Sequence, residues 1–375
     1  MASTNKPEND DLQYFLALAL APKIGPAVFK AILAYAGSPK RFFELPKGKV
    51  SKTPSVGPKL LELRNQEQKL LAKAESIIEQ STKQGFSILT SLHPDFPQRL
   101  KLQEDGPVVL FSKGKANLNF ERTVGIVGTR SATSYGKDVT KRIVEQLLPY
   151  QPAIISGLAY GIDIEAHRVA LNFGLPTVAV LGSPIDHIYP GIHRSTAEAL
   201  QETGALMSEY PPGSKMVPGN FPARNRIIAG LSDALIVVEA AKKGGALITA
   251  EIAYSYNKEV FAVPGNLQSQ YSEGCNHLIQ KMKANIFTGP YDIAQALFWP
   301  EPGEKKQEKP NLDLSNRSPE EKMILSLLQE LKEVDIDKLS LETEIGLGNL
   351  ASILLSLEFE GIVKSLPGKK YKLLH

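Results

Sequence analysis

The feature that most constrains the fold is a regular alternation of apolar and helix-like segments between residues 123 and 298. Six apolar runs, TVGIVG, AIISGL, TVAVLG, ALMSEY, ALIVVEA and EVFAVPG, are separated by segments whose apolar residues recur at helical spacing. Strands that are apolar at nearly every position are buried on both faces, as in parallel sheets with helices on both sides. We therefore predict an α/β fold with a doubly wound parallel sheet, in a domain that covers residues 86–298.

The flanking segments predict two smaller domains. Residues 1–85 read as a helical domain, in which the segments 22–33 and 54–64 each place a Gly-Pro pair before a helix. These segments are either two helix-hairpin-helix-like units, whose turn amides hold a DNA phosphate, or simply two helices that begin with proline. Residues 299–318 are rich in Pro, Lys and Glu and predict a linker. Residues 319–375 predict three helices and a β-hairpin, the pattern of a winged helix.

The composition predicts where the protein is located and which domains bind an anionic polymer. The chain has one cysteine, Cys275, so it has no disulfide framework, and we expect a reducing, cytoplasmic location. The first residues do not form a signal peptide, and no apolar run approaches the about 18 residues of a membrane span. Residues 1–90 hold 13 Lys or Arg against 8 Asp or Glu, whereas residues 300–375 hold 11 against 14. An anionic polymer would therefore bind the first two domains rather than the last.

The loops that follow the predicted strands carry the candidate binding groups. In a doubly wound sheet, ligands bind at the carboxyl ends of the strands, so these loops meet at one edge. Each such group is common by itself, but five or six loops supply phosphate donors, cations and aromatic rings together, as in a groove for a single nucleic-acid strand. The cations and aromatic residues are Arg130, Tyr160, Tyr189, His193, Arg194, Lys215, Phe221, Arg224, Arg226, Lys242 and Lys243.

The arginines of FPARNR raise a specific question. Pro222 suits the first turn of a helix, but Arg224 and Arg226 would place two cations near a helix N-terminus, where the helix dipole disfavours them by about 0.3–1 kcal/mol each. A phosphate bound at the same place would reverse the sign of this interaction. We therefore expect both arginines to contact the phosphates of a bound strand.

Signals of enzymatic chemistry are weak. Neither G-x-G-x-x-G nor a P-loop is present. Asp163 and His167 lie one helical turn apart, and we interpret them as a hydrogen-bonded pair that braces a helix rather than as a metal site or a proton-transfer pair. Cys275 is expected to pack in the interior. We predict no catalytic residue, no metal and no cofactor.

Several motifs in one order carry a resemblance. The segments VGIVGTRSATSYG, SGLAYGIDIEAHRVAL, VAVLGSPIDHIYP, SEYPPG, FPARNRIIAGLSDALIVVEA and FAVPG resemble the DNA-processing protein DprA (Smf) family. The resemblance implies an extended Rossmann-like domain that binds single-stranded DNA, forms a homodimer and loads the RecA recombinase during natural transformation. This chain departs from the family pattern in three places: KGGALIT stands in place of SGSLIT, GIHRS stands where a lysine often follows YP, and the lysine before FPARNR is displaced. The resemblance also gives the expected DNA-binding residues. They are Arg130, Ser156, Gly157, Lys215, Phe221, Arg224, Asn225, Arg226, Gly244 and Gly245.

An enzyme is the alternative. KKGGALITAE is close to the GGxGTxxE signature of nucleotide phosphoribohydrolases, but Thr249 and Glu251 are out of register with it. Two further expectations concern assembly. The helix at 246–257 is apolar on nearly every side, and Tyr254 and Tyr256 are the candidate anchors of a homodimer. The third tail helix carries Asn349 but no Lys or Arg, so we predict that the tail contacts protein rather than duplex DNA.

Overall fold

The computed structural model describes residues 9–53, 56–300, 317–331, 333–366 and 370–373. Its contacts divide the chain into two compact units, Met1–Trp299 and Pro300–His375, and each is described by itself. Most of the predicted linker, residues 301–316, lies outside the described residues, as does the predicted turn at Pro367 and Gly368.

The first unit is built on a nine-stranded sheet with the order β1-β2-β6-β5-β4-β3-β7-β8-β9. The strands from β6 to β9 are parallel to their neighbours, and β1 and β2 add an antiparallel edge. This confirms the predicted doubly wound sheet, and it supplies the strand order that the sequence did not predict. The strands are β1 Ser87–Thr90, β2 Val109–Gly114, β3 Thr123–Val127, β4 Ala153–Ser156, β5 Thr177–Leu181, β6 Ala205–Ser208, β7 Ala234–Val237, β8 Glu259–Ala262 and β9 Asn285–Ile286.

The strand order places β3 at a reversal of direction. From β3 the chain builds β4, β5 and β6 toward one side, and then returns to place β7 on the other side of β3. In open α/β sheets the crevice for a ligand lies at such a switch point, outside the carboxyl ends of the strands. The fold therefore points to the loops after β3 and β7.

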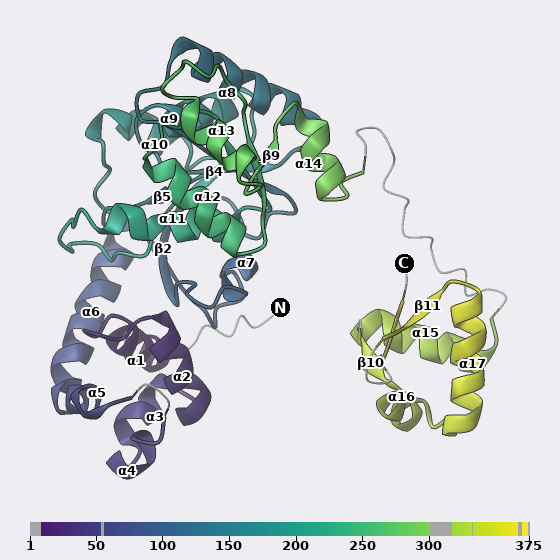
Figure 1. Cartoon of the computed structure of the whole chain (residues 1–375). Helices are drawn as coiled ribbons and strands as arrows, with labels where there is room; N and C mark the ends of the chain where they lie inside the picture. The colour runs from purple at the N-terminus through teal and green to yellow at the C-terminus, as the bar shows by residue number, and fades with distance from the viewer. Residues whose placement is uncertain (1–8, 54–55, 301–316, 332, 367–369, 374–375) are drawn as a thin grey trace. The chain divides into compact units, whose positions relative to one another are not determined.

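Helices cover both faces of the sheet (Figure 1). Ile154 of β4 packs in the cluster with α8, α9 and α14, whereas its neighbour Ile155 packs in the cluster with α7, α11, α12 and α13. This alternation follows from the two-residue period of a strand. The helices are α7 Gln98–Lys101, α8 Ser134–Leu147, α9 Ile162–Asn172, α10 Arg194–Ala199, α11 Asn220–Leu231, α12 Gly245–Ser255, α13 Glu273–Gln280 and α14 Pro290–Ala296.

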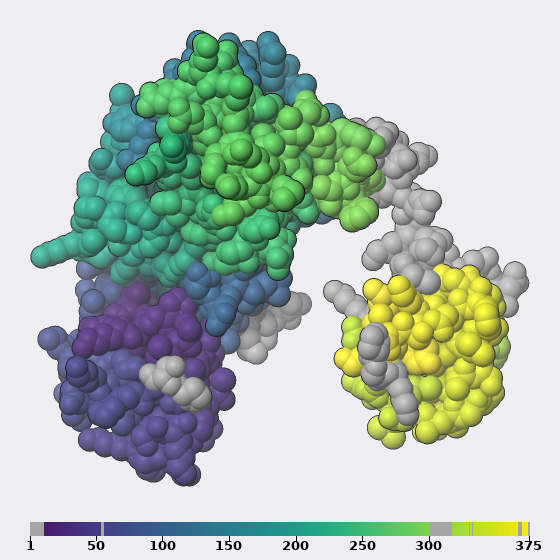
Figure 2. Space-filling model, viewed as in Figure 1, coloured from purple at the N-terminus to yellow at the C-terminus, as the bar shows by residue number. Residues whose placement is uncertain are grey.

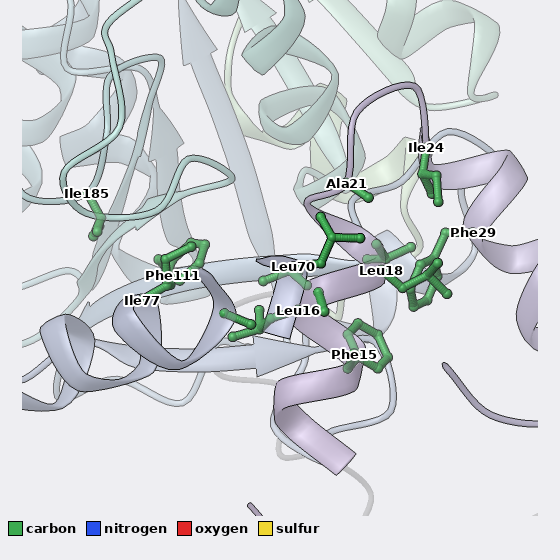
Figure 3. Close-up of a cluster of buried hydrophobic side chains, with 14 of the residues drawn as sticks. Phe15, Leu16, Leu18, Ala21, Ile24, Phe29, Leu70, Ile77, Phe111 and Ile185 are labelled. Atoms are coloured by element: carbon green, nitrogen blue, oxygen red, sulfur yellow. The ribbon is translucent and has the colours of Figure 1, made fainter. Parts of the chain in front are cut away.

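The N-terminal helices share a hydrophobic core with the edge of the sheet. Phe15, Leu16 and Leu18 of α1 belong to one buried cluster with Ile77 of α6 and Phe111 of β2 (Figure 3). In the space-filling view these helices, in purple and blue, form a continuous surface with the sheet-containing part (Figure 2). The predicted domain boundary after residue 85 stays a prediction. The helices are α1 Asn9–Ala19, α2 Pro26–Ala36, α3 Pro39–Glu44, α4 Lys47–Val50, α5 Pro58–Leu61 and α6 Glu67–Gln84.

Both Gly-Pro pairs begin helices. Pro26 is the first residue of α2 and Pro58 is the first residue of α5, and the preceding glycines adopt nearly the same extended conformation, with φ of −86° and −87°. Proline at the first position loses no helical hydrogen bond, because its missing N–H would have no partner there. The assignment of these segments to helix-hairpin-helix-like units remains a prediction.

Helix α12, whose apolar faces we expected to be covered by flanking helices or by a second subunit, leaves one side open in the single chain. Ile248 and Tyr254 are 45% and 50% exposed, and Glu251 is exposed beside them. The buried side consists of small residues such as Ala246, Ala250 and Ala253, which let the helix lie close to α11 and the sheet. Tyr256 follows the helix, and its hydroxyl donates a hydrogen bond to Asp105.

The second unit has the predicted winged-helix elements. Its three helices are followed by a hairpin, and a short strand makes a three-stranded sheet of order β10-β12-β11. Its core includes Leu325, Leu339, Leu354 and Val363. The elements are α15 Pro319–Leu331, β10 Val334–Asp335, α16 Ile336–Thr343, α17 Leu347–Phe359, β11 Val363–Leu366 and β12 Lys370–Leu373. No helix among the described residues of the whole chain is long and apolar enough to cross a membrane.

Candidate functional site

A cavity of about 460 Å³ opens at the carboxyl ends of β3, β4 and β7, and we call it the switch-point cavity. Its position matches the rule for doubly wound sheets, because the strand order reverses between β3 and β7. Three cationic side chains and one carboxylate line it. The lining residues are Val127, Gly128, Thr129, Arg130, Ala159, Asp163, Phe221, Pro222, Arg224, Asn225, Ile228, Ala240, Ala241, Lys243, Gly244, Gly245, Ala246, Ile248 and Thr249.

The loop after β3 presents Arg130, whose side chain is exposed. Glu239, at the end of β7, holds this loop in place. Its carboxylate accepts hydrogen bonds from the amide and the hydroxyl of Thr133, at 3.0 and 2.6 Å, and its carbonyl accepts one from the amide of Thr129 at 2.7 Å. Arg130 is therefore an exposed cation on a loop that is fixed on both sides.

Arg224 lies beneath the cavity rather than at a helix start. Helix α11 begins at Asn220, so Arg224 is one turn inside it, and the residue is only 5% exposed. Its Nη1 donates to the carbonyl of Gly157 at 2.8 Å and to that of Val180, which lie at the carboxyl ends of β4 and β5. Our expectation of two arginines at the helix N-terminus is thus corrected, because the guanidinium is held by carbonyls at strand ends, deep in the fold.

Burial sets the electrostatics of the pair Arg224 and Asp163. Burial lowers the pKa of the Arg224 guanidinium to about 10, and the charge of Asp163 opposes this shift. Burial also raises the pKa of Asp163, and Arg224 opposes that shift in turn. Arg224 keeps its proton at neutral pH, so the floor of the cavity remains cationic. Its Nε is buried and has no hydrogen-bond partner in the described part of the chain.

The predicted pairing of Asp163 with His167 is wrong. His167 Nδ1 lies 2.7 Å from Thr177 Oγ1, and that hydroxyl donates to the carbonyl of Ile154 at 2.9 Å, so Nδ1 carries the proton and donates to Thr177. Asp163 instead lies beside the amides of Gly157 and Ala159. Burial lowers the pKa of His167 to about 3, so the ring is neutral. His167 thus braces α9 against β5, and no metal-binding cluster occurs among the described residues.

Gly157 is the point where the cavity floor has no room for a side chain. A Cβ at this position would lie 2.6 Å from Arg224 Nη2 and 2.6 Å from Asp163 Oδ2. The preceding residue, Ser156, is fully buried and donates its hydroxyl to the carbonyl of Ile126 at 2.6 Å. Gly157 therefore lies at the site, whereas Ser156 supports it from within the sheet.

The wall on the side of β7 is formed by the start of α12. Gly244 and Gly245 line the cavity, and Asn225 Nδ2 donates to the Gly245 carbonyl at 3.3 Å, which ties α11 to α12. Lys243 is exposed at the same wall. The structure therefore brings Asn225, Gly244 and Gly245 together as expected, with a cation beside them.

Phe221 closes the cavity on the side of β5. Its ring packs over Gly182, where a Cβ would lie only 2.6 Å from the ring. The ring centroid lies 5.4 Å from that of Tyr189, with an angle of 60° between the planes. Phe221 is thus a partly exposed aromatic wall in a fixed position.

Four of the expected site residues do not line the cavity: Ser156 and Gly157, which lie behind its floor, and Arg226 and Lys215. Arg226 Nη2 donates to both carboxylate oxygens of Glu209, at 2.7 and 2.6 Å. Lys215 is exposed in the loop between β6 and α11. The pattern FPARNR places Arg224 and Arg226 on different sides of α11, because residues two apart on a helix do not share a face.

Comparison with known proteins gives the family. A family description, DNA recombination-mediator protein A, matches residues 87–298, and a second, DprA winged helix domain, matches residues 307–369. The chain is 31% identical to the protein Smf of Synechocystis over 97% of its own length and 99% of the relative's. The chain belongs to the DprA/Smf family. It is also 38% identical to the DNA processing protein DprA of Bacillus subtilis, over 63% of this chain and 79% of that protein.

Solved structures agree with this assignment. The crystal structure of DprA from Streptococcus pneumoniae has a TM-score of 0.65 at 32% identity, covering 75% of this chain and 95% of that one. A DprA from Helicobacter pylori, whose structure concerns a single-stranded DNA binding mode, has a TM-score of 0.51 at 30% identity, over 57% of this chain and 95% of that one. The DprA fold of the sheet domain and the winged-helix tail are therefore both shown.

Glu251, the glutamate that the phosphoribohydrolase alternative needs, does not line the switch-point cavity. Glu251 is exposed on α12, outside the lining, and accepts hydrogen bonds from Lys283 Nζ at 2.8 and 2.6 Å. Thr249 does line the cavity, but its hydroxyl donates to the Gly245 carbonyl at 3.1 Å. Cys275 does not line the cavity either. Its side chain is fully buried, and burial raises the pKa of its thiol to about 12.

Sequence reasoning missed two residues of the site. Asp163 was interpreted as a helix brace and Glu239 only as the end of a strand, whereas Lys243 was among the cations expected at this edge. A signal for Asp163 was present, since it follows a predicted strand and such loops meet at one edge. The role of Glu239 depends on Thr133, 106 residues away in sequence, so no local pattern predicts it.

Proposed function

We propose that this DprA family member binds single-stranded DNA at the switch-point cavity and acts in DNA processing and recombination without catalysing a reaction. The observation that carries the proposal is the charge of the cavity. Arg130, Arg224 and Lys243 line it against one carboxylate, Asp163, whose pKa is raised by burial. A cationic cavity with an aromatic wall suits the phosphate and the base of a single strand.

The three cations have different parts in this proposal. Arg130 and Lys243 are exposed and supply the contacts that attract the strand, since salt-dependent affinity comes from exposed cations that neutralise phosphates. Arg224 is fixed by two carbonyls before any ligand arrives, so it binds without rearrangement. Gly244 and Gly245 let the strand approach the backbone, whereas Gly157 makes room for the Arg224 guanidinium. Phe221 offers a ring for base stacking, and Lys215 contributes to the field around the edge.

We also propose the assembly that the resemblance implies. In this proposal the protein works in the cytoplasm as a homodimer and delivers the bound strand to the RecA recombinase. Family membership supports this assembly, and so does the exposed face of α12 with Ile248 and Tyr254, which a partner would cover. Light scattering of the full chain should then give about twice its mass of 40.9 kDa.

A salt series tests the binding site. Affinity for a labelled oligothymidylate is measured by fluorescence anisotropy for the parent chain and for Arg130→Ala, Lys243→Ala and Lys281→Ala. The first two should flatten the logarithmic salt slope by about 0.7 for each lost phosphate contact. Lys281 is an exposed lysine at the opposite end of α13 from this edge and serves as the control. Equal slopes for all four proteins would place the site elsewhere.

A second measurement tests the absence of catalysis. Incubation with AMP and CMP should release no free base, because Glu251 lies outside the cavity. Release of base that depends on Glu251 would instead support the phosphoribohydrolase alternative.

A further inference from the structure

The loops on the two sides of the switch-point cavity differ in chemistry. On one side, the loops after β4, β5 and β6 carry Tyr160, Tyr189 and Lys215, and the two tyrosines are 48% and 45% exposed. On the other side, the loop after β7 carries the exposed Lys242 and Lys243, the second of which lines the cavity, but beyond this loop residues 263–272 after β8 contain no lysine or arginine, and Glu273 follows them. Cations and exposed rings are what a single strand needs to follow a surface. Beyond the cavity wall, cations and exposed rings occur together on the side of β4, β5 and β6, so that side offers the strand the more favourable path.

Phe221 and Tyr189 connect the cavity to this path. Phe221 lines the cavity, but Tyr189 does not, and their centroids are 5.4 Å apart. Phe221 is fixed over Gly182 at the end of β5, so the neighbouring Tyr189 ring continues the aromatic surface outward from the cavity. Both rings are held in place before a ligand binds, which reduces the entropy lost on binding.

The second tyrosine is held as well. The ring of Tyr160 meets His193 edge to face at 5.1 Å, and His193 is 3% exposed. His193 Nδ1 donates to the carbonyl of Leu158 at 2.8 Å, which fixes the loop that follows β4. Tyr160 and Tyr189 thus stand on the loops that follow the neighbouring strands β4 and β5.

We propose that a strand bound in the switch-point cavity continues across the carboxyl ends of β4 and β5 toward β6, and that Tyr189 stacks a second base beside the one on Phe221. This inference rests on the proposed function. It adds the direction of the strand and a base-contacting residue outside the cavity. The ligand class is an unpaired nucleobase, read by its flat face and therefore without preference for sequence.

The test is a mutant cycle between protein and DNA on the full chain. Tyr189→Ala is compared with the parent on a short oligothymidylate and on a series in which each nucleotide in turn lacks its base. Tyr189→Ala should weaken binding of the intact strand by about 5- to 150-fold, the range expected for one base stack. That loss should disappear at one abasic position. Tyr189→Phe should bind as the parent does, and the salt slope of all variants should be unchanged.

Tyr291→Ala is the matched control for direction. Tyr291 is a 58% exposed tyrosine at the start of α14, after β9 and beyond β8. It should bind as the parent does, whereas an equal loss in Tyr291→Ala would overturn the proposed direction. If Tyr189→Ala does not fold, Tyr189→Leu, which keeps an apolar side chain but has no aromatic face, replaces it with the same expectation of a base-dependent loss.

The outcomes separate the inference from the proposed function. If the parent binds the oligothymidylate and Arg130→Ala flattens the slope, but Tyr189→Ala binds as the parent does, the inference is overturned and the proposed site stands. If the parent does not bind the oligothymidylate, the proposed function fails with it.

Discussion

The guanidinium of Arg224 lies in direct contact with the backbone of Gly157 beneath the floor of the cavity. Arg224 Nη1 donates to the Gly157 carbonyl at 2.8 Å, and a Cβ on residue 157 would lie 2.6 Å from Nη2. The glycine and the arginine are therefore matched in size. The buried charge has this position only because residue 157 has no side chain.

Gly157→Ala should displace the guanidinium. The added methyl group meets Arg224 and Asp163 at a distance that atoms do not tolerate, so we expect a loss of stability of about 1–3 kcal/mol and weaker binding of single-stranded DNA. Urea denaturation and anisotropy measure the two effects. The control is Gly191→Ala, where a Cβ would meet no atom within 4 Å. A Gly157→Ala protein with parental stability would show that Arg224 is free to move.

Arg226 should stabilise the fold without contributing to the salt slope. Its guanidinium is bound to both oxygens of Glu209, and both side chains are largely buried, with 16% and 22% exposed. Arg226→Ala should cost about 1.5–3 kcal/mol, since a charge-assisted hydrogen bond is lost. The double variant with Glu209→Gln should lose less than the sum of the two single variants. A flattened salt slope for Arg226→Ala would show instead that Arg226 leaves Glu209 to bind phosphate.

Stability should fall in acid partly through His167. Its pKa in the folded protein is about 3, below the value of 6.5 expected on unfolding, because burial disfavours the charged ring. The unfolded chain therefore binds more protons between pH 6.5 and 3, and His167 contributes a loss of up to about 1.4 kcal/mol per pH unit as pH falls through this range. Its contribution is fully retained above pH 6.5.

His167→Gln removes this titration and should reduce the acid slope of the unfolding free energy by that amount. His187→Gln, at an exposed position, is the matched control variant. Comparison of slopes isolates His167 from neighbours such as Asp163, whose raised pKa acts in the opposite direction. Identical slopes for both variants would refute the assignment.

The winged-helix tail should not read duplex DNA. The exposed positions of α17 include Leu347, Leu355 and Phe359, the last of which is 84% exposed, and the helix has no lysine or arginine. Asn349, which could read a base, donates to Glu320 at 3.3 Å. A chain that ends at Trp299 should therefore bind both single-stranded and duplex DNA as the full chain does in mobility-shift assays. Loss of duplex affinity on truncation would assign DNA binding to the tail.

The sequence was sufficient to predict the elements and the edge that carries the site. Strand and helix periods are local properties, so β3 to β8 and the tail helices follow from patterns of a few residues. The rule that ligands bind at carboxyl ends then selects the loops with Arg130, Gly157, Phe221 and Gly244. The partial exposure of α12 was not predictable, because its composition is apolar and its neighbours decide which face is covered.

Only the tertiary structure decided which of the charged groups are free. Arg224 and Arg226 look equivalent in sequence, yet one is bound by the carbonyl of Gly157, 67 residues away, and the other by the carboxylate of Glu209, 17 residues away. His167 likewise forms its hydrogen bond with Thr177 on β5 and not with Asp163, which lies one turn before it on α9. A local sequence pattern identifies a side chain that can carry a charge or a proton, but it does not identify the group that this side chain contacts. Its partner depends on which segments the sheet order brings together, and that order is set by the packing of the whole chain.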